Sequence, residues 1–133
     1  MGLDLGTKTI GVATSDLTRQ IATPVEVIAR TKFTEDANRL IEIAGRENIG
    51  LFVLGLPVSM DGSEGPRAQS TRAFARNLAR LTPIPIVYWD ERLSTAAVER
   101  MLIQADTSRA KRDAVVDKLA AAWLLQSALD SLR

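Results

Sequence analysis

Cysteine and histidine are both missing from this 133-residue chain. Without them the protein has no disulfide, thiolate nucleophile, imidazole general base or Cys/His zinc site. Any catalysis therefore relies on carboxylates, arginine, lysine, hydroxyl groups or a bound ion. No apolar run approaches the ~20 residues of a membrane-spanning helix, and the N-terminus carries no recognisable export signal. We expect a cytoplasmic protein with no membrane partner.

The chain also lacks a large excess of either charge, because its net charge is only +1. Its distribution is nevertheless uneven: residues 67–112 contain nine Lys or Arg against four Asp or Glu, whereas residues 1–66 contain six against nine. Arginine supplies 13 of the 17 cations, and its planar guanidinium suits phosphate. The basic middle segment favours a polyanionic partner, although a solvated helix face explains any single arginine equally well.

Hydrophobic patterning predicts one domain over residues 1–133 with the element order βββαβαβαα. Three short strands, near residues 3–5, 10–14 and 21–28, are joined by tight turns and must be antiparallel neighbours. Two helices, one capped by Thr34 and one beginning at Pro66, each lead into a buried strand, at 51–55 and 86–89.

A short helix within 94–102 and a last helix from about Ser108 complete the expected elements. Three antiparallel strands followed by two parallel ones, with right-handed crossovers, are typical of the α/β ribonuclease H-like fold, a five-stranded mixed sheet flanked by helices.

Acidic residues fall where this fold brings strand ends together. Asp4 lies near the end of the first strand, and Asp90 and Glu91 end the last one. In open α/β sheets, ligands bind outside the carboxyl ends of the parallel strands. Asp4 shares its face of the strand with Gly2, and we expect the missing side chain there to leave space for an ion or a phosphate. The alternative is that Asp4 only caps the turn that follows it.

The last helix supplies further candidate acids. Asp113 falls within its apolar stripe, and Asp117 falls at the edge of the stripe. A carboxylate in such a place is costly to bury unless it is paired or bound to a cation. An ion pair with Arg112 or Lys118, or the helix dipole, explains Asp113 better than it explains Asp117. The stripe consists of Val115, Val116, Leu119, Ala120, Trp123 and Leu124.

Carboxylates from the first strand, the last strand and the last helix could together hold Mg²⁺ or Mn²⁺, which prefer oxygen ligands. Two such ions about 4 Å apart can activate water and stabilise the leaving oxygen in phosphodiester hydrolysis, without histidine or cysteine. The basic segment would then hold the nucleic-acid backbone. Its candidate contacts are Arg67, Arg72, Arg76, Arg92, Arg109, Lys111 and Arg112.

Four blocks of sequence carry a resemblance over nearly the whole chain. They are DLGTKTIGVA from Asp4, GLP from Gly55 with MDGSEGP from Met60, DERLST from Asp90, and VDKLAA from Val116. In this order and at these spacings, they resemble the YqgF/RuvX family of ribonuclease H-like nucleases. The resemblance implies a nuclease that matures the 5′ end of precursor 16S ribosomal RNA and interacts with ribosomal particles.

The resemblance also implies roles for particular residues. Asp4, Glu91 and Asp117 would be the catalytic, metal-binding acids, with Asp90 as a possible fourth metal ligand. Lys8 and Arg92 would contact phosphate beside the metals, and the loop over 57–67 would form one wall of the site.

Two departures from related sequences matter for the site. Thr9 stands where a second basic residue is common. Related RuvC resolvases carry an acid at the end of the fourth strand, where this chain reads Leu54-Gly55-Leu56. The metal set must therefore differ from theirs.

Other functions stay open at this point. An older description of the family is a Holliday junction resolvase acting on branched DNA, which normally needs a two-fold dimer; here we expect a monomer or a weak homodimer. A non-catalytic nucleic-acid or ribosome-binding module is another alternative, although such a module gains nothing from keeping three acids beside phosphate. Asp4-Leu5-Gly6-Thr7 also resembles the phosphate loop of actin-like ATPases, but 133 residues cannot supply their two domains.

Overall fold

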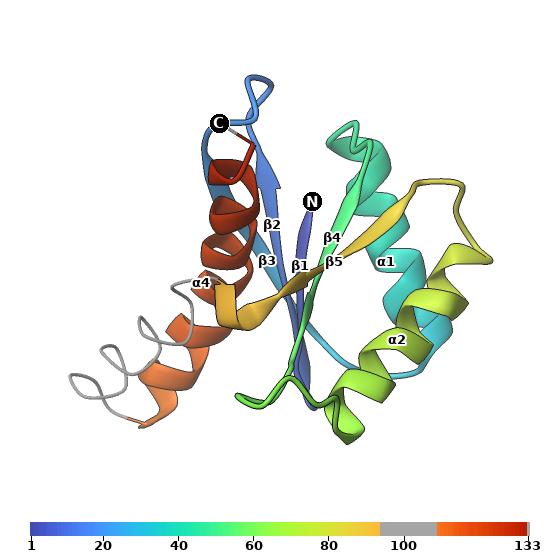
Figure 1. Cartoon of the computed structure of the whole chain (residues 1–133). Helices are drawn as coiled ribbons and strands as arrows, with labels where there is room; N and C mark the ends of the chain where they lie inside the picture. The colour runs from blue at the N-terminus through green and yellow to red at the C-terminus, as the bar shows by residue number, and fades with distance from the viewer. Residues whose placement is uncertain (94–108, 133) are drawn as a thin grey trace.

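A five-stranded mixed sheet forms the centre of the molecule (Figure 1). The computed structural model describes residues 1–93 and 109–132, with side chains described over 1–93 and 119–132. The strand order is β3-β2-β1-β4-β5, with β1–β2 and β2–β3 antiparallel and β1–β4 and β4–β5 parallel. The predicted arrangement of three antiparallel and then two parallel strands is confirmed. The strands are β1 (Gly2–Leu5), β2 (Thr9–Ser15), β3 (Ala22–Ala29), β4 (Phe52–Leu56) and β5 (Ile86–Asp90).

Helices cover both faces of this sheet. Figure 1 shows α1 (Phe33–Arg46) and α2 (Pro66–Ala79) on one face and α4 (Arg109–Asp130) on the other. A single 3-10 turn, η1 (Glu91–Leu93), follows β5 directly. The predicted short helix within 94–102 lies outside the described residues. None of the described helices has a stretch long and apolar enough to cross a membrane.

Element boundaries differ from the predictions by a residue or so. The first helix begins at Phe33, so the prediction of Thr34 as its cap is wrong. The reason is that Asp36, inside the first turn, accepts a hydrogen bond from the Thr31 backbone N–H at 3.1 Å. This bond fixes the backbone that leads into the helix, so the helix begins before Thr34. Pro66 does open α2, as predicted, because its fixed φ and missing N–H suit a first helical position.

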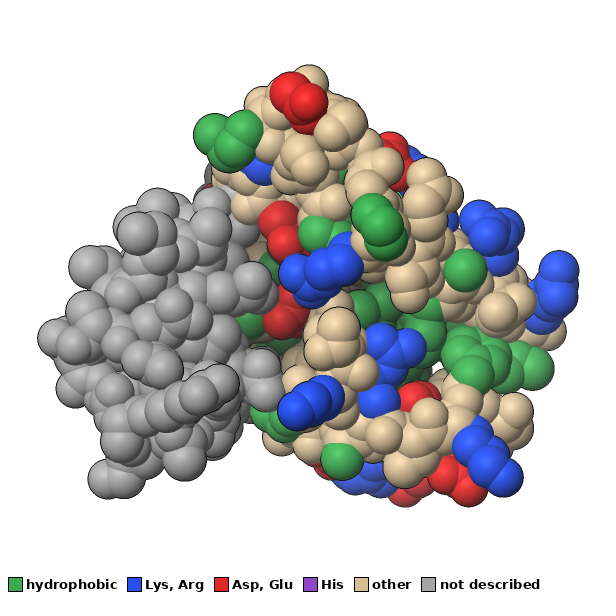
Figure 2. Space-filling view, turned by 90° about the horizontal axis from the view of Figure 1, so that it is seen from below, with side chains coloured by type: hydrophobic (Ala, Val, Ile, Leu, Met, Phe, Trp, Pro, Cys, Tyr) green, Lys and Arg blue, Asp and Glu red, His purple; other side chains and the backbone are tan. Residues whose placement is uncertain are grey.

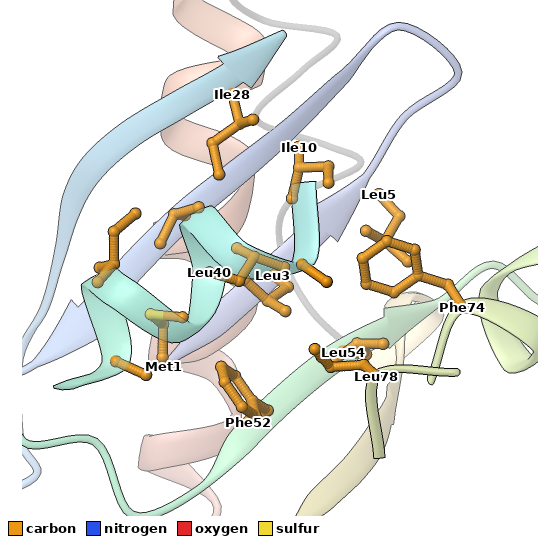
Figure 3. Close-up of a cluster of buried hydrophobic side chains, with 14 of the residues drawn as sticks. Met1, Leu3, Leu5, Ile10, Ile28, Leu40, Phe52, Leu54, Phe74 and Leu78 are labelled. Atoms are coloured by element: carbon orange, nitrogen blue, oxygen red, sulfur yellow. The ribbon is translucent and has the colours of Figure 1, made fainter. Parts of the chain in front are cut away.

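Strand alternation places the larger core on the side of α1 and α2. Leu3 and Leu5 of β1 point to this side, where Leu3 and Leu54 are fully buried (Figure 3). On the other face, β1 presents Gly2 and Asp4, and the smaller cluster beneath α4 includes Val53. The α4 face of β1 is therefore the one that carries a carboxylate.

Candidate functional site

The carboxyl ends of β1, β4 and β5 lie at the same edge of the sheet, because these three strands are parallel. This edge is the lower end of the molecule in Figure 1. Figure 2 shows it from below, with acidic side chains near its centre and Lys and Arg side chains beside them and around the face. The sequence prediction placed the candidate acids at this edge.

Asp4 lies beside Gly55 on the α4 side of the sheet. Leu3 of β1 is paired with Leu54 of β4, and continuing this register by one residue brings Asp4 next to Gly55. Asp4 is half-buried, and the residue has an interaction partner within the protein. A buried or half-buried carboxylate needs such a partner or a cation to offset its lost hydration.

Glu91 reaches the same place from β5. Gly55 pairs with Trp89, and Trp89 lies on the α4 side, where its indole N–H donates to Ser127 Oγ at 3.2 Å. Glu91 is two residues further along, and its Oε1 lies only 2.9 Å from where a Cβ on Gly55 would be. The absence of a side chain at Gly55 is thus what lets the Glu91 carboxylate lie over β4, next to Asp4.

Gly2 has a different role from the one predicted. A Cβ there would lie 2.8 Å from Leu125 Cβ and 3.0 Å from Ala121 O, so α4 already fills the space above Gly2. The expectation that Gly2 leaves space for an ion or a phosphate is therefore wrong. Gly2 allows the helix to approach the sheet, whereas the missing side chain at Gly55 makes room for the Glu91 carboxylate and the end of Leu124.

The close approach at Gly2 also fixes the position of residue 117 along the direction of β1. Ala121 lies over Gly2, and α4 runs antiparallel to β1 (Figure 1). Residue 117 is one helical turn before Ala121, about 6 Å towards the carboxyl end of β1. Asp4 is displaced from Gly2 in the same direction by about 6.6 Å. The backbone therefore sets Asp117 at the level of Asp4, although its side chain lies outside the described ones.

Asp90 is held by a neighbouring arginine. Its Oδ2 accepts from Arg92 Nη2 at 2.7 Å and its Oδ1 accepts from the Arg92 backbone N–H at 2.9 Å. The Arg92 guanidinium holds the pKa of Asp90 below its usual range. Tyr88 packs on the α2 side, so alternation directs Asp90 to that side, away from the face of Asp4. The structure does not bring Asp90 together with Asp4 and Glu91.

Arg92 in turn reaches the loop after β4. Its Nη1 donates to Ser59 O at 3.3 Å and to Met60 O at 3.4 Å. The guanidinium is thereby fixed between Asp90 and this loop, one residue from Glu91. That position suits a phosphate contact next to the acids.

The other predicted contacts divide into four groups. Lys8 is exposed in the β1–β2 turn, and Arg76 is exposed on α2. Arg72 is paired with Glu64 at 2.6 Å and lies over the Tyr88 ring, so its positive charge already has a carboxylate partner. Arg67 donates to Leu5 O at 3.3 Å, close to the acids. Arg109, Lys111 and Arg112 belong to the first turn of α4, and their side chains lie outside the described ones.

Two residues near the site were missed in the sequence. Gly55 stands out in the sequence as part of the GLP block and for lacking an acid, but its role depends on a contact with Glu91 that no local pattern reveals. Arg30 follows β3, and its Nη1 donates to Gly6 O at 2.7 Å, in the turn after Asp4. Its lone position at a strand end gave no signal.

As far as the described residues go, no group of three acids is close enough to hold a metal ion. Among the predicted ligands with described side chains, Asp4 and Glu91 lie on the same face of the sheet and Asp90 does not, and the ligand roles of all of them stay predictions. The remaining one, Asp117, is placed by the backbone alone. Its role as a ligand stays a prediction too.

Comparison with known proteins gives several full-length relatives. One, from Rhodopseudomonas palustris (strain BisB5), is 65% identical over 132 residues, covering 99% of this chain and 82% of the relative. Another, from Paracoccus denitrificans (strain Pd 1222), is 66% identical, covering 99% of this chain and 84% of the relative. Both carry the name "Putative pre-16S rRNA nuclease".

Solved structures show the same fold at low identity. RuvC from Thermus thermophilus, in complex with a Holliday junction substrate, matches with a TM-score of 0.58 and 13% identity, covering 98% of this chain and 92% of that chain. The Fowlpox virus resolvase, in complex with Holliday junction DNA, matches with a TM-score of 0.51 and 14% identity, covering 98% of this chain and 96% of that chain. These matches confirm the predicted ribonuclease H-like fold.

The sequence model of the RuvX family, described as Holliday junction resolvase, matches residues 1–131. With the relatives above, this match shows that the chain belongs to the RuvX family.

Proposed function

We propose that this protein is a divalent-metal-dependent nuclease that hydrolyses phosphodiester bonds, and that its substrate is precursor 16S ribosomal RNA, cleaved at the 5′ end. The observation that carries the nuclease proposal is the meeting of Asp4 and Glu91 around Gly55 at the carboxyl ends of β1, β4 and β5. The choice of ribosomal RNA rests on the names of relatives that are about two thirds identical to this chain.

The donor set fits a hard cation. Carboxylate oxygens are the ligands that Mg²⁺ and Mn²⁺ prefer, and this chain has no histidine or cysteine that could favour a softer ion. The side chain missing at Gly55 leaves Glu91 Oε1 over the strand that lies next to Asp4. Asp4, Glu91 and Asp117 would hold the metal. When bound, two such ions would lower the pKa of water and stabilise the leaving oxygen.

The protein's own residues would then bind and orient the strand. Arg92, fixed by Asp90 and by two loop carbonyls, is preorganised to contact a phosphate next to Glu91. Lys8, exposed in the β1–β2 turn, is placed to contact the strand on the other side of Asp4. Contacts that are fixed in advance cost less ordering on binding, and so they help to align the scissile bond.

The test is a cleavage assay on a precursor 16S transcript with Mg²⁺ or Mn²⁺, comparing the unmodified protein with Glu91→Gln and Asp117→Asn. Glu42→Gln is the matched control, since Glu42 is an exposed acid of α1 that pairs with Arg39. We expect at least a hundredfold loss of cleavage in the first two variants and none in the control. Equal cleavage by all four proteins, or none by the unmodified protein, would overturn the proposal.

Cleavage of branched DNA is the second candidate function. The family description, Holliday junction resolvase, is the observation that favours it. Junction cleavage needs two sites on two strands and hence a two-fold dimer. Mass measurement with and without junction DNA, together with the same variants on a junction substrate, separates the two functions. A strict monomer that cleaves the transcript and leaves the junction intact favours RNA.

A further inference from the structure

Two arginines from distant parts of the sequence meet at the β1–β2 turn. Arg30 follows β3, and its Nη1 donates to Gly6 O at 2.7 Å. Arg67 lies in the first turn of α2, and its Nη2 donates to Leu5 O at 3.3 Å. Both carbonyls belong to the two residues directly after Asp4. The two guanidinium groups are therefore held at the same point of the sheet edge.

Between these groups lies a small polar pocket, which we call the Arg30–Arg67 pocket. Its volume is about 50 Å³, several times the space that one water needs. Thr7 and Ser70 contribute hydroxyl groups to its lining, and the ring of Phe74 lies 5.8 Å from the Arg30 guanidinium carbon. The pocket can thus surround a compact group that accepts hydrogen bonds.

Within the described residues, no carboxylate pairs with the two arginines of this pocket. No carboxylate lines it, and neither Arg30 nor Arg67 forms an ion pair within the part of the chain that the structure describes. Arg39, Arg72 and Arg92, by contrast, each have a carboxylate partner. A guanidinium has five N–H donors, of which each backbone carbonyl uses one. Two such cations side by side repel each other, and an anion between them would remove that repulsion.

We infer that the Arg30–Arg67 pocket binds one phosphate group of a nucleic-acid strand. A guanidinium fork matches phosphate oxygens in pairs, and the hydroxyls of Thr7 and Ser70 can donate to the others. Because Leu5 lies on the α1 and α2 side of the sheet, this phosphate sits across the edge of β1 from Asp4. The pocket then fixes how far the strand extends past the cleavage site. The inference takes its ligand class, nucleic acid, from the proposed function.

Binding of a fluorescent single-stranded RNA in EDTA tests the pocket without cleavage. Arg30→Gln and Arg67→Gln should each raise Kd roughly tenfold. Because both contact one phosphate, the double variant should lose little more than either single variant. The slope of log K against log salt should fall by about 0.7 in all three, the value for one phosphate of a single strand. Arg80→Gln, at the far end of α2, is the matched control and should leave Kd within about twofold.

Losses that simply add, with a slope that falls by about 1.4 in the double variant, would mean two separate surface contacts and would overturn the shared pocket. The same assay with RNA bearing a 5′-phosphate or a 5′-hydroxyl identifies the source of the phosphate. A preference for the 5′-phosphate that disappears in Arg67→Gln assigns a terminal phosphate, and an equal loss for both RNAs assigns an internal one.

A second measurement uses the unmodified protein, in case the variants fail to fold. Inorganic phosphate is titrated while the arginine Nε–H signals are followed by NMR. The signals of Arg30 and Arg67 should shift together with one apparent Kd, while those of Arg19 and Arg80 move little. Equal shifts for all four arginines would overturn the inference. This result does not depend on cleavage, so it stands or falls separately from the nuclease proposal.

Discussion

The Glu91 carboxylate lies in the space that a side chain on residue 55 would occupy: a Cβ on Gly55 would lie 2.9 Å from Glu91 Oε1 and 3.1 Å from both Cδ atoms of Leu124. Each of these atoms is the far end of a flexible side chain. Glu91 therefore depends on Gly55 for its position over β4. The fourth strand carries no acid of its own here, and the carboxylate beside Asp4 comes from η1 instead.

Replacing Gly55 by alanine should separate activity from stability. The added methyl displaces the ends of Glu91 and Leu124, which can move at a cost of about 1–2 kcal/mol in the free energy of unfolding. Displacement of the carboxylate should lower cleavage at least tenfold and weaken Mn²⁺ binding. Urea unfolding and the cleavage assay measure the two effects. Gly45→Ala in α1, where no atom lies within 4 Å of the added Cβ, should instead stabilise the protein by about 0.5–1 kcal/mol. Full activity of Gly55→Ala would contradict this account of the site.

Gly2→Ala should act mainly on stability. Its Cβ would meet Leu125 Cβ at 2.8 Å and the backbone oxygen of Ala121 at 3.0 Å, and a helix backbone cannot move aside as a side-chain end can. We expect the free energy of unfolding to fall by about 2–3 kcal/mol. Urea unfolding checks this, and an unchanged midpoint would mean that α4 is not packed against β1 as described.

Asp90 and Glu91 are adjacent in sequence but should give different kinetic defects. Asp90→Asn removes the charge that holds Arg92 and leaves Glu91 in place. We expect KM for the transcript to rise several-fold, with kcat and Mn²⁺ affinity nearly unchanged, because the arginine is no longer fixed. Steady-state kinetics and a Mn²⁺ titration measure these quantities. A large loss of kcat together with Mn²⁺ affinity would instead make Asp90 a metal ligand.

The turn between β2 and β3, which Asp16 closes, can be tested by pH. Thr18 Oγ1 and the backbone N–H groups of Ile21 and Gln20 donate to the Asp16 carboxylate and lower its pKa from 3.8 to about 2. A carboxylate with a lowered pKa stabilises the folded state above its ordinary pKa, and this contribution is lost as the pH falls from about 4 through 2. NMR titration of the Asp16 carboxyl group should give a midpoint near 2. A midpoint near 3.8 would show that the turn is not closed in solution.

The sequence predicts which strands and helices form better than it predicts the residue at which each one begins. Alternation and the tight turns sufficed for β1, β2 and β3, and Pro66 marked the start of α2, because these signals are local. Thr34 failed as a cap because the reach of Asp36 back to Thr31 competes with it. Here a side-chain hydrogen bond decides at which residue the helix begins.

In the site too, local features can be predicted from the sequence and contacts across the fold cannot. Position alone predicted Asp4, Asp90 and Glu91 as candidate acids, because strand ends in a parallel sheet meet at one edge, but it did not separate Asp90 from the other two. Gly2, Gly55 and Arg30 could not be interpreted, because each depends on a contact across the fold. The single domain over 1–133 and the ligand roles of Asp4, Glu91 and Asp117 stay predictions.

The most direct test of the central claim is a crystal structure of the protein with Mn²⁺, whose anomalous scattering locates the ion. We predict Mn²⁺ at the carboxyl end of β1, within ~2.2 Å of oxygens from Asp4, Glu91 and Asp117. Mn²⁺ bound elsewhere, with these three carboxylates more than ~6 Å apart, would contradict the proposed metal-dependent nuclease.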